Sequence, residues 1–448
     1  MSREKKYEID MCNGSIMDKL ISFALPLMLS GMLQLMFNAV DIVVVGRFSG
    51  SQSLAAVGAT TALIYLFTNL FIGISLGANV LAARYYAAEK HEEMSETVHT
   101  AMMFALISGI IMIFVGLFFS RLALEIMGTP SDVIDQATLY MRIYFLGMPF
   151  FMLYNYGAAI LRAVGDTKRP LIFLIISGVV NACLNMLLVI VFHLDVAGVA
   201  IATVTSQFIS CVLVIGCLYR TKSSYQLRFS RLKIRKEYLK PICQVGIPAG
   251  IQSTVINFSN ALLQSSVNSF GSTTMAGYTA ANNIFGFLYV SVNAITQACM
   301  SFTSQNYGLR KLKRMDKILM DCLILTVVVS LVLGGGVYLF GAEILRLYTE
   351  EAEVIRCGIE IFAYTTVTYF LCGIMDLFPG ALRGMDRSTV PMILSVIGTV
   401  GTRIVWVFWL FPAHRSLAFL FISYPASWLI TIVMQVICFY FVRRKVHG

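Results

Sequence analysis

The chain has 448 residues, of which 58% are hydrophobic and only 13% are charged. A soluble domain usually has about a quarter of its residues as Asp, Glu, Lys and Arg, because its surface must be charged as well as its core apolar. The composition therefore excludes a soluble globular protein and indicates an integral membrane protein, whose partner is the lipid bilayer. The formal net charge of +10 could indicate binding to a polyanion such as nucleic acid. Its distribution along the chain, described below, decides whether such a partner is needed to explain it.

The N-terminal segment, Met1–Asp10, is polar and charged. It lacks the apolar stretch of a cleavable signal peptide, so the first membrane helix is expected to direct insertion. The ten cysteines are scattered singly, a pattern that favours neither a disulfide framework nor a structural zinc site.

Runs without Asp, Glu, Lys or Arg locate the expected membrane helices, since a helix needs about 20 apolar residues to cross a bilayer. In the first half these runs lie between Lys19 and Asp41, Arg47 and Arg84, Glu96 and Arg121, Arg142 and Arg162, Arg169 and Asp195, and Asp195 and Arg220. In the second half the stretch Pro241–Leu309 is long enough for two helices divided by a turn at Phe270–Ser272, and further runs cover Cys322–Ala342, Ile361–Leu382, Ser388–Pro412 and Ser416–Val442. The sequence thus predicts an all-α membrane protein with twelve transmembrane helices.

Lys and Arg are distributed unevenly between the two faces of this arrangement. If the N-terminus is cytoplasmic, 27 of the 34 basic residues fall on the cytoplasmic side, six on the opposite side, and Arg403 inside a span. The positive-inside rule then predicts that both termini are cytoplasmic. This asymmetry explains the net charge without a nucleic-acid partner.

The two halves repeat one another in sequence. Leu161-Arg162 followed by Pro170 recurs 221 residues later as Leu382-Arg383 followed by Pro391, and with a slip of one residue Leu25-Pro26 matches Ile247-Pro248. We therefore expect two pseudo-symmetric six-helix lobes, residues 16–219 and 241–442, joined by a basic cytoplasmic linker at 220–240. Six helices per lobe give a parallel repeat, which is typical of transporters.

Polar side chains inside the first lobe form a candidate site, because ionisable groups within a span are rare and usually functional. Gln34, Asn38 and Asp41 share one face of the first helix, and Asn181 and Asn185 share one face of the fifth. Asn155 and Thr203 on the fourth and sixth helices would complete the pocket. Burial favours the neutral form of a carboxylate, so Asp41 could take a proton; equally, the oxygens of Asp41 and Asn181 suit Na⁺. Two alternatives stay open: Asp41 as a helix-end group at the interface, and the asparagines as interhelical hydrogen-bonding residues.

The second lobe carries two charges within its spans, Asp376 and Arg403. Repeat symmetry places Asp376 at the position of Asn155 and Arg403 beside that of Asn181. We expect an ion pair between them, because each is otherwise an unpaired charge in lipid; Asp376 would then be structural or recognise substrate charge. A hydrated substrate cavity is expected to be lined by these two charges and by amide side chains, which are Gln34, Asn38, Asn257, Asn260, Gln264, Asn282 and Asn283.

Several segments, taken in order, resemble the multidrug and toxic compound extrusion (MATE) transporters over residues 16–442. The matching segments are Pro26 with Asp41-x₄-Gly46, Leu161–Asp166 before Pro170, Gly198–Thr203, Gly246–Pro248, Gln305–Gly308 and Leu382–Met385. The resemblance implies two six-helix lobes, a central coupling role for Asp41, and a helix bend at Pro26, which would act as a hinge. The sequence departs from many members at Asn185, where they have an aspartate, and at Val255–Asn257, where some have a glutamate.

The function predicted from these observations is antiport. Na⁺ or H⁺ entry would drive the export of organic cations, drugs or other toxic small molecules by alternating access, with no cofactor besides the coupling ion. The nearest alternative is a flippase for lipid-linked glycans, which would need more cationic residues in its cavity. An intramembrane enzyme would need paired catalytic groups or metal ligands that the spans do not offer, so no enzymatic activity is expected. We expect a monomer in the plasma (cell inner) membrane.

Overall fold

The structure is a computed structural model, and it describes residues 7–447. The helices of the first half are α1 (Met17–Phe48), α2 (Gly50–Ala87), α3 (His91–Ile126), α4 (Ile134–Leu146), α5 (Met148–Ala163), α6 (Lys168–Asn185), which continues into the π-helical turns η2 (Met186–Val191), and α7 (Asp195–Arg220). Those of the second half are α8 (Lys236–Asn268), α9 (Ser272–Gly308), α10 (Leu312–Leu339), the short α11 (Gly341–Arg346), α12 (Ala352–Thr365), α13 (Tyr369–Gly384), α14 (Thr389–Ser395), η4 (Val396–Gly401), α15 (Thr402–Val405), η5 (Trp406–Leu410) and α16 (Leu417–His447). A 3₁₀ turn, η3 (Phe229–Arg231), lies in the segment between the halves.

The described helices fit the predicted twelve spans. Nine of them are long and apolar enough to cross a membrane, and the bent pairs α4–α5 (48°) and α12–α13 (50°) bring the number to eleven. The twelfth is α8, whose 33 residues are sufficient in length but include many Ser, Asn and Gln. The expected turn at 270–272 is confirmed: α8 ends at Asn268, and Gly271 adopts a φ of 101°, which favours glycine.

The chain folds as two compact units whose boundaries do not coincide with the predicted lobes at 16–219 and 241–442. The first unit holds Leu29–Gly250 together with the N-terminal residues up to Asp10, and the second holds Met11–Met28 and the chain from Ile251 onward. The divisions therefore fall inside α1 and α8, each two residues after a proline, Pro26 and Pro248. The difference arises because each of these long helices is continuous while packing its first part with one unit and the rest with the other.

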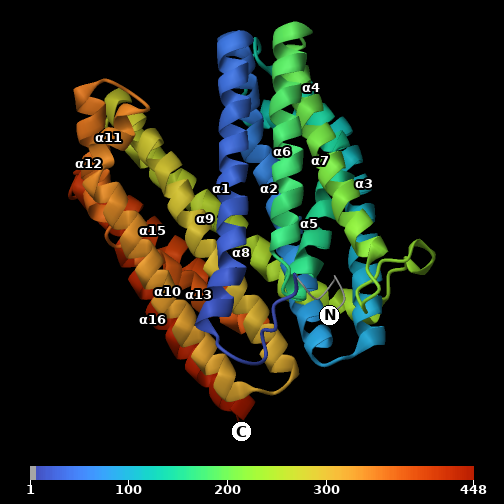
Figure 1. The fold of residues 1–448 in the computed structure, drawn as a ribbon. Helices are drawn as coiled ribbons and strands as arrows, with labels where there is room; N and C mark the ends of the chain where they lie inside the picture. Colours follow the sequence, from blue (N-terminus) through green and yellow to red (C-terminus); the bar gives the residue numbers. More distant parts are fainter. Residues whose placement is uncertain (1–6, 448) are drawn as a thin grey trace. The chain divides into compact units, whose positions relative to one another are not determined.

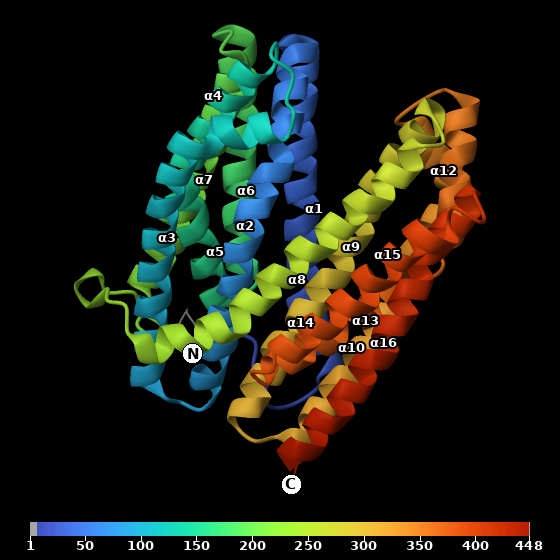
Figure 2. The same cartoon turned by 180° about the vertical axis from the view of Figure 1, so that it is seen from behind.

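The first unit packs α2 to α7 side by side (Figures 1 and 2, blue to green). Its core is built from residues such as Val45, Met102, Phe145 and Tyr156. The start of α8 packs against α2 at a crossing of glycines. A Cβ on Gly73 would collide with the backbone of Gly250, and one on Gly250 would lie 2.7 Å from Leu70 Cα. Glycine is therefore required for this close approach.

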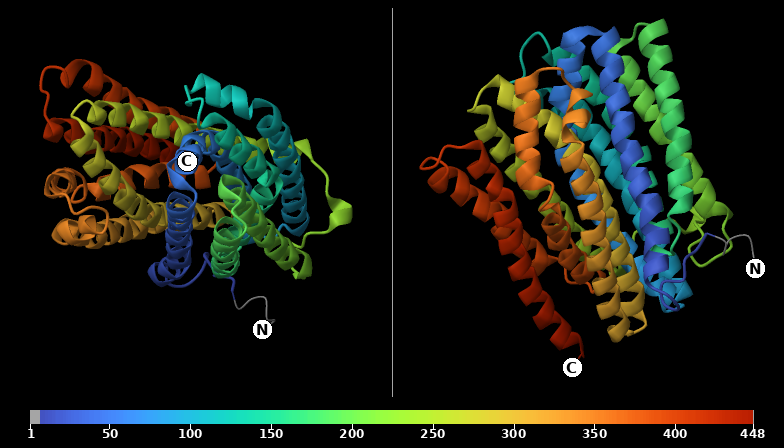
Figure 3. Two further views of the ribbon diagram at one scale, coloured as in Figure 1. Left: turned by 90° about the horizontal axis from the view of Figure 1, so that it is seen from above. Right: turned by 60° about the vertical axis from the view of Figure 1, so that its left-hand side comes forward.

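The second unit packs α9 against α10, α12 and α13, and α13 against α16. The two views of Figure 3 show these helices (yellow to red) running alongside one another. The first part of α1 belongs to this unit, where the Phe23 ring meets the Phe302 ring edge-on with centroids 5.6 Å apart. The core also contains Tyr278, Phe362 and Trp428.

The segment before α1 is held by hydrogen bonds in each unit. In the first unit, Tyr86 and Tyr225 donate to the two carboxylate oxygens of Glu8 at 2.7 and 2.8 Å. In the second unit, Asn306 donates to the Met11 carbonyl at 3.1 Å. The polar N-terminal residues that the structure describes are therefore part of the fold rather than a free extension.

Candidate functional site

The first candidate site is formed by α1, α6 and α7 in the first unit. The Asn185 side-chain amide donates to Asp41 Oδ1 and, at 3.2 Å, to Asn181 Oδ1. The Thr203 hydroxyl donates to the Val199 carbonyl of its own helix at 2.9 Å and lies near the Asp41 carboxylate. Four of the five predicted coupling-ion residues therefore meet at one place.

Close packing of α1 on α6 brings these residues together. Gly178 on α6 lies against the Phe37 ring, and a Cβ at position 178 would collide with it. Asp41 is one turn after Phe37, and Asn181 and Asn185 are one and two turns after Gly178, so the polar residues follow the same contact along both helices. π-helical turns begin at Met186, directly after Asn185, and such irregularities are frequent at functional sites.

The chemistry of the site is that of one carboxylate among neutral oxygens. Asn181 and Asn185 are 5% and 0% exposed, whereas Asp41 is half-buried. The Asn185 Oδ1 atom is buried and has no hydrogen-bond partner among residues 7–447. A buried, unsatisfied amide oxygen is costly, and beside a carboxylate it is a natural ligand for a small hard cation.

In the described part of the chain, Asn155, the fifth predicted coupling-ion residue, and the predicted cavity residues Gln34 and Asn38 make no hydrogen bond to this site. The Asn155 amide donates to the Phe151 carbonyl of its own helix at 2.8 Å. Gln34 and Asn38 are exposed, and no hydrogen bond joins them to another described residue. These three are therefore not first-site ligands in this conformation, although Gln34 and Asn38 share the helix face that carries Asp41.

The second candidate site surrounds Arg403, which is 2% exposed. Its Nη1 atom donates to Asn260 Oδ1 at 2.6 Å and to the Ser259 hydroxyl at 3.4 Å. The guanidinium carbon lies 4.6 Å from the centroid of the Tyr424 ring, a cation–π distance. The Tyr424 hydroxyl is in turn 3.2 Å from that of Tyr278.

The expected ion pair between Asp376 and Arg403 is wrong. Among the described residues the partners of Arg403 are neutral oxygens and an aromatic face, and its buried Nε has no hydrogen-bond partner. Asp376 is half-buried and interacts electrostatically with Arg383. Arg383 is seven residues further along α13, hence two turns away on the same face, and donates to Gln252 Oε1 at 2.7 Å. The spacing of Asp376 and Arg383 was the signal for this interaction; nothing in the sequence singled out Tyr424 or Gln252.

The remaining residues of the predicted substrate cavity do not converge in this conformation. Asn257, Asn282 and Asn283 are exposed. The Gln264 side chain donates to Asn268 Oδ1 at 3.1 Å, one turn along α8. Only Asn260 of this group reaches a charged residue of the second unit.

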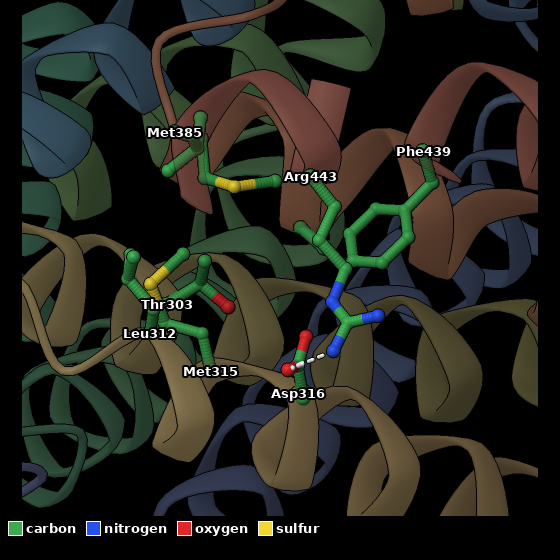
Figure 4. A pocket seen from close by; sticks show the side chains of 9 residues that line it. Thr303, Leu312, Met315, Asp316, Met385, Phe439 and Arg443 are labelled. Atoms are coloured by element: carbon green, nitrogen blue, oxygen red, sulfur yellow. Dashed lines mark hydrogen bonds and ion pairs between the residues drawn. The ribbon is translucent and has the colours of Figure 1, made fainter. Parts of the chain in front are cut away.

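A small pocket lies between α10, α13 and α16, away from every predicted site residue. It is lined by apolar side chains such as Met315, Met385 and Phe439. Arg443 donates to Asp316 Oδ2 at 2.6 Å, and this ion pair joins α16 to α10 at the pocket (Figure 4). We assign it a structural role.

Comparison with known proteins identifies the family. The MatE family model matches residues 26–187 and again 248–409. The chain therefore belongs to the MatE family of multidrug and toxic compound extrusion transporters, as its motifs indicated, and it is a multi-pass membrane protein. The second match begins 222 residues after the first, which confirms the internal repeat.

Individual relatives agree with this assignment. YoeA of Bacillus subtilis (strain 168), a probable multidrug resistance protein, is 28% identical over 434 residues, which are 94% of this chain and 93% of YoeA. The multidrug export protein MepA of Staphylococcus aureus (strain NCTC 8325 / PS 47) is 21% identical over 89% of this chain and 87% of MepA.

Two solved structures show the same fold. One is a multidrug resistance MATE family transporter of the MOP superfamily in an outward-facing conformation, with a TM-score of 0.88 and 20% identity over 98% of this chain and 97% of that one. The other, also with a TM-score of 0.88 over 98% of this chain and 97% of that one, at 21% identity, is a MOP superfamily transporter from Pyrococcus furiosus whose reversed pocket polarity suggests a different function.

Proposed function

We propose that this chain is a cation-coupled antiporter that exports drugs or other toxic small molecules, organic cations among them. The observation that carries the proposal is the Asp41 carboxylate, which accepts a hydrogen bond from Asn185 and lies near Thr203, with the unpartnered Asn185 oxygen beside it. A single negative charge among neutral oxygens suits Na⁺ or a proton. The names of YoeA and MepA support multidrug export as the transport direction and substrate range.

Exchange follows if ion and substrate favour different conformations. Binding of the inward-moving ion at Asp41, Asn181 and Asn185 would stabilise one state, and substrate would bind better to another, so that each ligand shifts the population toward its own state. Pro26 and Pro248 lie two residues before the divisions between the units. Because proline removes a backbone hydrogen bond within a helix, we assign the hinge to these positions.

The topology proposed for this cycle has both termini in the cytoplasm, because the side of the membrane that they share carries the excess of Lys and Arg. The transporter would act as a monomer in the plasma membrane. It needs neither a catalytic centre nor a cofactor besides its coupling ion, since gradients supply the free energy.

The test is efflux of a fluorescent cationic dye from vesicles that contain the purified protein. Na⁺ and pH gradients are imposed separately, and Asp41→Asn is compared with the unsubstituted protein. Gradient-driven movement that disappears in Asp41→Asn establishes antiport, and the effective gradient identifies the ion. Movement that persists in Asp41→Asn contradicts the assigned role of this residue.

A second candidate is a flippase for lipid-linked glycans, and one observation favours it. The second unit buries Arg403 on neutral partners, and an uncompensated guanidinium suits a pyrophosphate group. If neither gradient moves any of several dyes through folded protein, translocation of a fluorescent polyprenyl-pyrophosphate glycan in the same vesicles would support the flippase.

A further inference from the structure

The segment that joins α7 to α8 is fastened to the first unit rather than looping freely. The Leu227 amide donates to the Leu218 carbonyl at 3.0 Å, and the Arg228 amide donates to His99 Nε2 at 2.9 Å. Because a backbone amide can only donate, Nε2 accepts and Nδ1 carries the proton, which faces the Ser95 carbonyl at 2.6 Å. Figure 1 shows this segment (yellow-green) beside the first turns of α3.

Two further contacts fix the same segment. Tyr225 is fully buried, and its hydroxyl donates to Glu8 at 2.8 Å. Burial raises the pKa of Tyr225 to about 12, so the hydroxyl remains a donor at physiological pH. Arg235 forms an ion pair with Glu96 at 2.6 Å.

In this fastened segment the apolar side chains are buried or half-buried, whereas the basic side chains are exposed. Tyr225 and Leu227 are buried and Leu232 and Ile234 are half-buried. The basic residues of 220–240 are exposed, and they are Arg220, Lys222, Arg228, Arg231, Lys233, Arg235, Lys236 and Lys240. Among residues 7–447, no ion pair joins Arg228, Arg231 or Lys233 to a carboxylate, so these charges stay available.

Phe229 departs from this pattern, because it is a large apolar residue that is exposed among the basic side chains. It is 57% exposed and lies against Tyr219, which is 53% exposed, with the rings stacked at a centroid distance of 5.6 Å. Gln226 supports the pair: its amide donates to the Tyr219 carbonyl at 3.2 Å, and its oxygen accepts from Arg228 Nε at 3.1 Å. The exposed stack and the Arg228 guanidinium are thus held in one place.

Tyr219 continues the lipid-facing side of α7. Ile201, Phe208 and Val212 are exposed apolar residues of this helix, and spacings of seven, four and seven residues put them and Tyr219 on one face. Tyr219 is in the last turn of the span, where aromatic residues typically meet the membrane interface. Phe229, stacked on it, therefore lies at the membrane surface among basic side chains.

We propose that Tyr219 and Phe229, with Arg220, Arg228, Arg231 and Lys233, form an interfacial site for the headgroups of anionic phospholipids. The aromatic stack would enter the region of the glycerol backbone and the upper acyl chains, and the guanidinium groups would bind the lipid phosphates, for which their planar donor geometry is suited. Clusters of four to eight basic residues directly beyond a membrane span commonly bind anionic lipids. This site lies in the first unit and does not depend on the antiport proposed above.

The experiment uses tryptophan at position 229 as a reporter. Phe229→Trp protein is reconstituted into phosphatidylcholine vesicles that contain either brominated phosphatidylglycerol or brominated phosphatidylcholine at equal mole fractions. The emission difference from the unsubstituted protein isolates position 229 from Trp406, Trp409 and Trp428. We expect stronger quenching by the anionic lipid. The affinity of the site for anionic relative to neutral lipid should rise about fivefold for each participating basic residue at low salt.

Matched charge changes test where the preference originates. Arg228→Gln with Arg231→Gln should reduce the preference about tenfold or more, whereas Lys313→Gln with Lys317→Gln, two exposed positions at the start of α10, should leave it intact. Equal quenching by both lipids overturns the anionic selectivity, and quenching by neither overturns the membrane contact. If inorganic phosphate abolishes the preference, the site takes free phosphate and the lipid assignment is wrong.

Discussion

The two units carry opposite charges in corresponding regions of the repeat, although not at equivalent positions: Asp41 corresponds to Leu263, and Arg403 to Asn181. The family matches begin at residues 26 and 248, and this offset of 222 relates Asn181 to Arg403 and Asn38 to Asn260. In the first unit a carboxylate contacts an amide donor, while in the second a guanidinium contacts an amide oxygen and a tyrosine face. One duplicated scaffold thus holds an anion in one unit and a cation in the other.

The difference indicates a division of labour after duplication. π-helical turns follow the charged region in both units, at Met186–Val191 and Trp406–Leu410. The two units therefore share this backbone irregularity but differ in the charged side chain near it. A carboxylate with an unsatisfied amide oxygen beside it is suited to exchange a cation. A guanidinium with one short hydrogen bond to a neutral oxygen is fixed in its charge, and it is better suited to orienting a substrate or stabilising a state.

The largest expected effect tests this assignment directly. Asp41→Asn should abolish gradient-driven transport, because the amide keeps the shape but cannot carry the charge that the ion neutralises. The matched change in the second unit, Asp376→Asn, should keep the gradient dependence. Vesicle efflux under each gradient is the measurement, and equal loss in both variants would contradict the division of labour.

A smaller effect is expected for the amide that contacts the carboxylate. Asn185→Leu removes a hydrogen bond to a charged group, an interaction of about 1.5–3 kcal/mol, as well as an oxygen ligand. The apparent affinity for the coupling ion should fall about tenfold or more, while transport at saturating ion persists. Titrating initial efflux rates with the ion measures this, and Asn155→Leu, whose amide bonds its own helix, is the control; an equal shift in both would argue against the assigned contact.

The third prediction concerns stability in the second unit. Asn260→Leu leaves the Arg403 guanidinium buried without its shortest hydrogen bond, and it should lower stability by about 1.5–3 kcal/mol. Asn38→Leu at the repeat-related position is expected to have little effect, because Asn38 is exposed. Thermal unfolding in detergent compares the two, and matching melting temperatures would show that the Arg403 contact is not stabilising.

Much of this arrangement was predictable from the sequence. Charge-free runs locate helices because lipid excludes unpaired charges, and Asn181, Asn185 and Asp41 were found because helical spacing places polar residues on one face. The meeting of Asp41 with Asn185 could be expected because Asp41 is the only ionisable residue between Lys19 and Arg47 and an unpaired carboxylate in a span needs a polar partner.

Contacts of the second site were less accessible to such reasoning. Charge pairing favoured Asp376 as the partner of Arg403. An arginine can instead contact neutral oxygens and an aromatic ring, and residues that offer these groups are too numerous in this chain for the sequence to single out the right ones. The divisions after Met28 and Gly250 were missed for a similar reason. They depend on which neighbours a continuous helix touches, and hydrophobic runs carry no such information.

A last comparison concerns the two repeat-related helix crossings. The start of α8 meets α2 through glycines, whereas the start of α1 meets α9 through the rings of Phe23 and Phe302. Gly246→Ala would place a Cβ against Ile74 and 2.9 Å from the Gly73 carbonyl oxygen, so the backbones must separate. We expect a loss of about 1–3 kcal/mol, typical of overpacking.

The control for this crossing is Gly216→Ala on α7, where an added Cβ meets nothing within 4 Å. This change should be neutral or stabilise the protein by up to about 1 kcal/mol, since alanine is the better helix former. Melting temperatures of the two variants distinguish packing from propensity. If Gly246→Ala is as stable as Gly216→Ala, the crossing is loose enough to open, and glycine there serves motion of α8 rather than close packing.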